Sequence, residues 1–207
     1  VLALGESMGF SAKNVDNYGG HIDFSGKTDR IMGIIGHLDV VPAGSGWDFD
    51  PYGGELSEGK IYGRGTTDDK GPVISCLYAM KALKDAGYEP NCTIRLIIGL
   101  DEETHWKGIK YYFEHEQKPD FGFTPDADFP VINGEKGMLI FDFAKKITPP
   151  QGQAKGLKLR SLKGGTAPNS VADSCRAVLR SDEEGTYDLI KEMVYGYRQE
   201  TGYKLNV

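Results

Sequence analysis

The chain has 207 residues, 39% of them hydrophobic and 26% charged, which is the composition of an ordinary globular protein with a sizeable core. Its formal net charge of -6 and the absence of a Lys/Arg-rich run argue against nucleic acid or an anionic membrane surface as a main partner. No run approaches about eighteen consecutive apolar residues, so no membrane span is predicted.

Short apolar runs alternate with helical patterns over the first two thirds of the chain. Residues 2–10 resemble the end of a helix, and residues 31–36 and 93–100 are predicted to form short buried strands. Between these strands, residues 72–86 carry apolar side chains at helical spacing, with a proline at the start and Gly87 just past the end. This order of strand, helix and strand predicts an α/β fold with a mostly parallel sheet and helices on both faces.

A change of composition divides the chain after its first two thirds. Before it, we expect a second helix over residues 107–116 and paired strands joined at a turn over residues 129–143. Residues 145–156 are rich in Pro, Gly, Gln and Lys, which is the composition of a linker. We therefore predict a larger domain over residues 1–145 and part of a smaller domain over residues 146–207.

The second part of the chain shows only a few elements. Residues 156–162 alternate in polarity, residues 164–169 have the composition of a turn, and residues 176–181 form a short apolar run. An amphipathic helix is predicted from about residue 183 to residue 200. These elements predict part of a small α+β domain.

A histidine and an aspartate follow the first buried strand, where open α/β sheets place their ligands. His37 and Asp39 are two residues apart, so in an extended chain they point the same way and Asp39 can orient the His37 ring. The alternative for His37 is a histidine satisfied by a local hydrogen bond.

Two adjacent carboxylates, Asp68 and Asp69, stand among glycines directly before the predicted helix. The alternative to a binding role is helix capping, in which one of them accepts a bond from the first helical N–H groups. One cap suffices, however, and the second charge then needs a partner, which a metal ion would provide.

A third acidic cluster, Asp101, Glu102 and Glu103, follows the second buried strand. Such neighbours repel one another unless cations lie between them, and one glutamate could bind metal while the other takes a proton from water. The alternative is a solvated acidic loop. The fourth position is Asp126, for which Asp128 is a competitor and an Asx-turn after a proline is the alternative. Four such positions in one order on one α/β frame favour a metal site.

Four segments of the sequence resemble those of a known family. The segments HLDVVPAGSGW, ELSEGKIYGRGTTDDKGP, DEET and FTPDADFPVINGEKG are similar to those of the aminoacylase/carboxypeptidase family of co-catalytic zinc metallopeptidases. Within it they resemble the PepV-type dipeptidases, also called carnosinase-like or Xaa-His dipeptidases. The resemblance covers residues 18–136 and then thins to GGTAPNSVAD. It implies that residues 1–145 are a zinc-binding, zinc exopeptidase-like catalytic domain and residues 146–207 the beginning of a lid domain.

The resemblance implies a set of metal ligands. Asp68 would bridge two zinc ions, His37 and Asp126 would complete the protein ligands of one ion, and Glu103 would bind the other. Zinc suits a mixture of histidine and carboxylate ligands, although Mn²⁺ or Co²⁺ would fit the same oxygen-rich site. The peptide bond between Asp68 and Asp69 is expected to be cis.

The resemblance also implies catalytic and substrate-binding residues. Glu102 would be the general base, with Asp39 orienting His37. Asn169 matches a lid residue that faces the substrate carbonyl, and its alternative is a turn-forming asparagine after a proline.

One departure from the family concerns the second zinc ion. The family supplies a further histidine from a segment near the C-terminus of the catalytic domain, whereas the last histidine here is His115. We expect segments missing at both ends and favour a polypeptide that continues beyond Val207. The other hypotheses are that another chain supplies the missing segment, or that this copy of the protein is inactive.

The predicted function is metal-dependent hydrolysis of the peptide bond of dipeptides by a di-zinc-activated water. The predicted partner is therefore a small peptide substrate. One alternative function is that of an N-acyl amino acid deacylase or aminotripeptidase of the same family. The other is that of a noncatalytic metal- or peptide-binding fragment. Cys76, Cys92 and Cys175 form no C-x-x-C pair and are odd in number, which makes a poor disulfide framework and predicts a reducing, cytoplasmic setting.

Overall fold

The computed structural model describes residues 1–128, 130–135, 137, 139, 156–165, 172, 174–203 and 206. The chain divides into two compact units, Val1–Lys136 and Gly137–Val207, and each is described by itself. The predicted boundary near Lys145 lies outside the described residues. Within the described residues, no helix combines the length and the apolar character needed to cross a bilayer.

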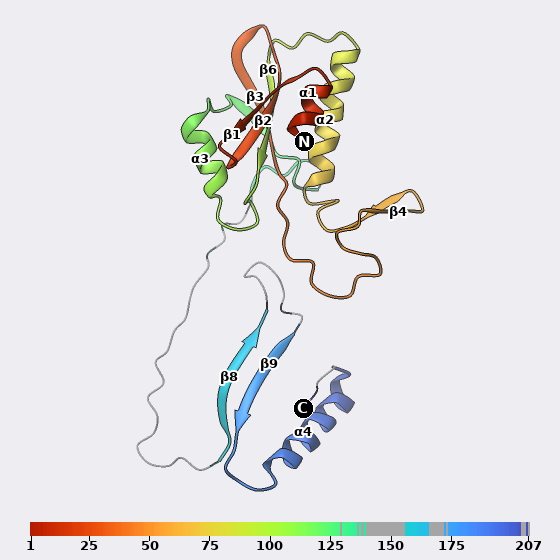
Figure 1. Ribbon diagram of the computed structural model, residues 1–207, viewed down its shortest axis with the longest axis vertical. Helices are drawn as coiled ribbons and strands as arrows, with labels where there is room; N and C mark the ends of the chain where they lie inside the picture. Colours follow the sequence, from red (N-terminus) through yellow and green to blue (C-terminus); the bar gives the residue numbers. More distant parts are fainter. Residues whose placement is uncertain are drawn as a thin grey trace. The chain divides into compact units, whose positions relative to one another are not determined.

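The first unit is built on a five-stranded sheet (Figure 1). In sheet order the strands are β1 (Ser11–Val15), β2 (Gly19–Phe24), β6 (Cys92–Gly99), β3 (Thr28–His37) and β7 (Phe121–Phe123). β3 runs parallel to β6 and to β7, whereas β1 pairs with β2, and β2 with β6, in the antiparallel sense. The α/β class is as predicted, but the sheet is mixed, so the prediction of a mostly parallel sheet is wrong for the described strands.

The antiparallel half of the sheet comes from a tight hairpin that is absent from the elements predicted from the sequence. Asp16, Asn17 and Tyr18 connect β1 to β2, and the first two, at the centre of the turn closed by the Tyr18 amide and the Val15 carbonyl, have positive φ, at 51° and 61°. Two central residues with positive φ give the turn whose twist matches that of antiparallel strands, and Asp and Asn adopt this conformation more readily than most residues. The hairpin places β2, rather than a further parallel strand, beside β6.

Helices cover both faces of this sheet, as predicted (Figure 1). α1 (Leu2–Ser7) and α2 (Lys70–Asp85) lie on one face, and α3 (Lys107–His115) lies on the other. Side chains of β6 alternate between the faces: Leu96 joins the core beneath α2, and Ile97 joins the smaller core with Tyr112 of α3. The predicted unit of strand, helix and parallel strand is therefore confirmed as β3, α2 and β6.

A second, smaller sheet connects β3 to α2. Its strands are β4 (Glu55–Ser57) and β5 (Lys60–Tyr62), which form an antiparallel hairpin. The paired strands predicted over residues 129–143 are not found in the described part of that range, since residues 131–135 are irregular and most of the remainder lies outside the described residues.

The second unit contains the elements predicted for the end of the chain. β8 (Lys158–Gly164) pairs with β9 (Cys175–Arg180) in the antiparallel sense, and α4 (Thr186–Thr201) follows. Asn169, predicted to contact substrate, lies outside the described residues.

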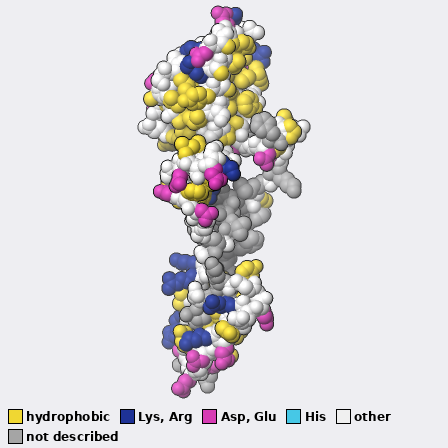
Figure 2. All heavy atoms as spheres, turned by 90° about the vertical axis from the view of Figure 1, so that its right-hand side faces the viewer, with side chains coloured by type: hydrophobic (Ala, Val, Ile, Leu, Met, Phe, Trp, Pro, Cys, Tyr) yellow, Lys and Arg dark blue, Asp and Glu magenta, His cyan; other side chains and the backbone are white. Residues whose placement is uncertain are grey.

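Apolar side chains also reach the surface of the first unit. Figure 2 shows hydrophobic side chains on the side that carries α1 and α2, where Leu4, Tyr78 and Leu83 are exposed. Apolar atoms contribute a large part of the surface of any folded protein. The residues that stabilise the fold are those that α2 buries against the sheet, namely Val73, Leu77 and Met80.

We expect Leu77→Ala to lower the free energy of unfolding by about 2–5 kcal/mol, because Leu77 is fully buried and its loss leaves a cavity beneath α2. Leu83→Ala on the same helix is the matched control, since Leu83 is 40% exposed and its truncation should cost about 1 kcal/mol or less. Urea unfolding followed by circular dichroism measures both. Equal losses in the two variants would contradict the assignment of the core.

Candidate metal centre

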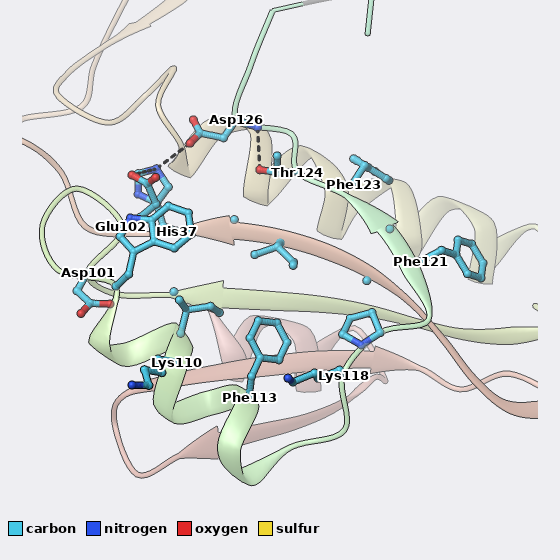
Figure 3. Close-up of a pocket in the computed structure, with 18 of the residues that line it drawn as sticks. His37, Asp101, Glu102, Lys110, Phe113, Lys118, Phe121, Phe123, Thr124 and Asp126 are labelled. Atoms are coloured by element: carbon cyan, nitrogen blue, oxygen red, sulfur yellow. Dashed lines mark hydrogen bonds and ion pairs between the residues drawn. The ribbon is translucent and has the colours of Figure 1, made fainter. Parts of the chain in front are cut away.

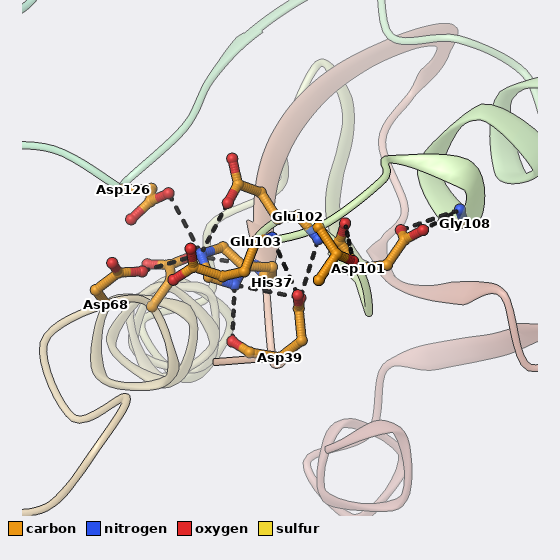
Figure 4. A network of polar contacts seen from close by, with 10 residues as sticks. His37, Asp39, Asp68, Asp101, Glu102, Glu103, Gly108 and Asp126 are labelled. Atoms are coloured by element: carbon orange, nitrogen blue, oxygen red, sulfur yellow. Dashed lines mark hydrogen bonds and ion pairs between the residues drawn. The ribbon is translucent and has the colours of Figure 1, made fainter. Parts of the chain in front are cut away.

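Four segments that are distant in the sequence meet at one end of the sheet (Figure 4). His37 is the last residue of β3, and Asp68 stands two residues before α2. Glu102 follows β6, and Asp126 follows β7. The carboxyl ends of the parallel strands β3, β6 and β7 lie at the same edge of the sheet, which is why their following loops converge.

Carboxylate oxygens surround one nitrogen of the His37 ring. Nε2 of His37 lies 3.0 Å from Asp68 Oδ1, 3.3 Å from Asp126 Oδ2 and 3.9 Å from Glu102 Oε2. Ligand atoms of His37, Asp68 and Glu103 also lie within 4.8 Å of one another. The residues predicted to bind metal are thus brought together around a single imidazole.

The hydrogen bonding of His37 determines which way its ring presents a lone pair. Nδ1 of His37 lies 3.0 Å from the carbonyl oxygen of Asp39, which can only accept, so Nδ1 carries the hydrogen. In the neutral ring Nε2 then has a lone pair, and this buried atom has no hydrogen-bond partner of good geometry in the structure. A lone pair facing several carboxylates is repelled unless a proton or a cation lies between them.

These atoms fit a divalent cation. Besides the group of His37, Asp68 and Glu103, a second group of ligand atoms, from His37, Asp69 and Asp126, lies within 4.8 Å. A neutral imidazole nitrogen with several carboxylate oxygens is a donor set that suits zinc. Asp69 Oδ1 is, like His37 Nε2, buried without a hydrogen-bond partner, so the site contains unsatisfied polar atoms that a cation would stabilise.

Two carboxylates near the site, those of Asp39 and Asp101, accept hydrogen bonds from main-chain N–H groups. The Asp39 carboxylate accepts from the amides of Glu102 and Glu103, both at 3.1 Å. The Asp101 carboxylate accepts from the amides of Lys107 and Gly108 at 2.7 and 3.0 Å, at the beginning of α3. These bonds link the end of β3 to the loop after β6, and that loop to α3.

Asp39 contacts His37 in a different way from the one predicted. Its carbonyl oxygen receives the Nδ1 hydrogen, whereas its carboxylate Oδ1 lies 3.4 Å from the same nitrogen. The carboxylate is committed to the two glutamate amides. The main chain of Asp39 therefore orients the ring, and its side chain orients the glutamates. Sequence spacing could not distinguish these two roles of one residue.

Asp69 occupies the N-cap position of α2, but its side chain makes no capping hydrogen bond. Instead, its Oδ2 accepts from the His37 amide at 3.1 Å. The capping alternative therefore does not account for the Asp69 carboxylate. The peptide bond between Asp68 and Asp69 is cis, as the family resemblance implies.

Burial and mutual repulsion shift the protonation of the site. Burial raises the pKa of Asp69 to about 6, against the lowering effect of its bond from the His37 amide. Burial, followed by neighbouring charges, also raises the pKa values of Glu102 and Asp126. Burial lowers the pKa of His37, but Asp126, the Asp39 carbonyl and the other neighbouring carboxylates raise it, and the net shift is upward. Each shift favours a proton in this negatively charged cluster.

An open groove adjoins the cluster (Figure 3). It has a volume of about 950 Å³, and His37, Glu102 and Asp126 line one end of it. Ile35 and Phe113 belong to the apolar part of its lining. The polar cluster is therefore accessible from a concave, largely apolar surface, which is the usual setting of a ligand site.

Two of the remaining histidines have other partners. His21 is buried and its Nδ1 bonds the Tyr112 hydroxyl at 2.8 Å, and His115 Nδ1 donates to the Tyr111 carbonyl at 2.8 Å. Among the described residues, His37 is the one histidine in either group of possible metal ligands. Asp128, the competitor of Asp126, is in neither group.

Comparisons with known proteins place most of the chain in one family. Residues 33–201 match Peptidase family M20/M25/M40. The chain is 44% identical over 179 residues to the Beta-Ala-Xaa dipeptidase of Lactobacillus delbrueckii subsp. lactis, covering 86% of this chain and 37% of that protein. It is also 44% identical over 179 residues to YtjP of Bacillus subtilis (strain 168), covering 86% of this chain and 38% of that protein.

A solved structure is similar as well. The crystal structure of human carnosine dipeptidase 1 superposes with a TM-score of 0.53 at 27% sequence identity. The superposition covers 62% of this chain and 32% of the human chain. The matched region spans about 38% of the length of the curated relatives.

The raised pKa of Asp69 predicts how pH affects the metal-free chain. Between its ordinary value of 3.8 and about 6, the folded chain holds this proton more tightly than the unfolded chain does. The free energy of unfolding should therefore fall as pH rises through this window, by on the order of 2–3 kcal/mol for a shift of this size.

Asp69→Asn removes the titrating group and serves as the reference. Urea unfolding of both proteins in EDTA at pH 4, 5, 6 and 7 measures the difference between their free energies of unfolding. We expect the natural chain to lose stability relative to the variant as pH rises. A difference that does not change with pH would contradict the assignment.

Proposed function

This chain belongs to Peptidase family M20/M25/M40, and on that basis we propose that it carries most of the active site of a zinc-dependent dipeptidase. The observation that carries the proposal is the His37 Nε2 lone pair, which faces carboxylates of Asp68 and Asp126 from two other loops. The name of the relative from Lactobacillus delbrueckii subsp. lactis, a Beta-Ala-Xaa dipeptidase, supports a dipeptide as the substrate.

We assign the metal ligands by their distances from one another. Asp68 would help to hold both ions, because its carboxylate is close to His37 Nε2 and belongs to the same group of possible ligands as Glu103. His37 and Asp126 would complete the protein ligands of one ion, and Glu103 would bind the other. Zinc is the proposed metal because imidazole and carboxylate donors occur together, and Mn²⁺ and Co²⁺ suit the same oxygen-rich set.

Glu102 is proposed to be the general base. Its carboxylate belongs to neither group of ligand atoms in the described structure, yet it lies 3.9 Å from His37 Nε2 and lines the groove. Burial raises its pKa, which makes the carboxylate a better proton acceptor than one in open solvent. Asp39 fixes the Glu102 amide and so limits where the side chain can reach.

The proposed reaction is hydrolysis of the peptide bond of a dipeptide. When bound, the two ions would polarise the scissile carbonyl and acidify a water molecule. Glu102 would take a proton from that water as its oxygen attacks the carbonyl carbon, and would then return the proton to the leaving amine. His37, with Nδ1 bonded to the Asp39 carbonyl, would keep Nε2 directed at the metal.

We expect Glu102→Ala to reduce kcat by about 10²- to 10⁴-fold, because it removes the proton acceptor. The zinc content, measured by mass spectrometry of the purified protein, should stay the same. Glu89→Ala is the control, because Glu89 is a solvent-exposed glutamate paired with Lys27 away from the cluster. Full activity in Glu102→Ala would defeat the assignment, whereas loss of zinc together with activity would make Glu102 a ligand.

A substrate panel tests the proposed substrate class. The natural, zinc-loaded protein should hydrolyse dipeptides at a higher kcat/KM than N-acetyl amino acids or tripeptides, and ninhydrin or chromatography detects the released amino acids. Preference for an N-acetyl amino acid or a tripeptide would indicate another hydrolase of this family. Zinc bound without hydrolysis of any of the three classes would indicate a noncatalytic metal-binding protein.

A further inference from the structure

One carboxylate at the centre has no part in the proposed chemistry. Asp69 is fully buried, with 0% of its surface exposed, whereas its neighbour Asp68 has a side chain that is 61% exposed. The Asp69 side chain does not cap α2, and it bonds the main chain of His37 instead. A carboxylate is costly to bury, so the contact that it makes requires an explanation.

The geometry points to Asp69 as a positioning residue for the metal centre: we propose that its carboxylate substitutes for a missing strand and fixes the main chain at His37. The hydrogen bond would hold the imidazole where it can share an ion with Asp68 and Asp126. This consequence rests on the proposed metal centre. The hydrogen bond between the His37 amide and the Asp69 carboxylate does not depend on metal and can be tested without it.

The sheet explains why the His37 amide needs such a partner. The Leu38 amide donates to the Gly99 carbonyl of β6 at 3.0 Å, so the preceding amide, that of His37, points to the opposite side of β3. The strand on that side is β7, but it pairs only with Met32, Gly33 and Ile34. The His37 N–H therefore extends beyond the end of β7, and Asp69 Oδ2 accepts it at 3.1 Å.

The backbone of β3 approaches the Asp69 carboxylate closely. A Cβ placed on Gly36 would lie 2.5 Å from Asp69 Oδ2 and 2.5 Å from Val73 Cγ2. Both distances are too short for non-bonded atoms, so glycine at this position is what lets the carboxylate reach the strand. The slot between β3 and the beginning of α2 is thus shaped for Asp69, independently of the hydrogen bond.

A direct metal ligand is the competing role, because Asp69 shares a group with His37 and Asp126. Oδ2 is already committed to the His37 amide, and only Oδ1 remains without a partner. An asparagine separates the two roles. Its single amide oxygen can still accept the His37 N–H, but it replaces a carboxylate with a neutral group that binds zinc poorly.

The test compares Asp69→Asn with Asp69→Ala in the 207-residue chain. In EDTA, amide hydrogen exchange followed by NMR should show His37 exchanging about tenfold faster or more in Asp69→Ala and within about threefold of the natural chain in Asp69→Asn. The Leu38 amide is the internal control, since it bonds Gly99 and should not change. Faster exchange of both amides would report general loosening and would overturn the specific role.

Zinc affinity, measured by competition with a chromophoric chelator, completes the test. We expect a loss of about 10- to 100-fold in Asp69→Ala and a small change in Asp69→Asn, as for residues that orient a ligand. Equal, large losses in both variants would make Asp69 a ligand and overturn the proposal. Unchanged exchange and affinity in Asp69→Ala would overturn it as well.

Gly36→Ala is the second variant in case Asp69→Ala does not fold. It leaves the carboxylate in the protein but displaces it from β3, and it should reproduce the faster exchange of His37 alone. If the natural chain binds no zinc, the proposed metal centre fails, while the exchange rates of the His37 amide still decide whether Asp69 positions the strand.

Discussion

The site depends on one electrostatic constraint: carboxylates converge on an imidazole nitrogen that, in the neutral ring, has no hydrogen to donate. The Asp39 carbonyl accepts the Nδ1 hydrogen of His37, so in the neutral ring Nε2 presents a lone pair to Asp68 and Asp126. Such an arrangement is unfavourable by itself and becomes favourable with protons or a divalent cation. Burial first, and then this crowding, raise the pKa of Asp126, and the neighbouring carboxylates raise the pKa of His37 against the effect of burial. The proposed zinc centre would relieve the same crowding.

Within each of two acidic clusters, one carboxylate belongs to the site and another bonds the main chain of the fold. In the pair before α2, Asp68 faces the imidazole while Asp69 accepts a main-chain N–H from β3. After β6, Asp101 accepts main-chain N–H groups from the beginning of α3 while Glu102 lines the groove. A carboxylate oxygen bonded to a main-chain amide is fixed in place. The loops that carry the charged residues are therefore held against their mutual repulsion.

Local patterns predicted the parts of the fold whose residues contact sequence neighbours. The helical spacing in α2, with a proline at its start and glycine beyond its end, gave its position to within two residues. The apolar runs likewise located β3 and β6. The hairpin of β1 and β2 was missed because β1 shows little apolar alternation, and its only strong signal is the turn at Asp16 and Asn17.

The sequence by itself determined the chemistry available to this protein, because the residue types at the ends of predicted strands already favoured a metal site. Its resemblance to a peptidase family gave those residues their expected roles. Only the tertiary structure decided which carboxylate of each cluster faces the imidazole and which one bonds the main chain. That choice depends on where a strand such as β7 stops and leaves the His37 amide without a partner. The end of one strand relative to another is a long-range property, and no local pattern in either segment encodes it.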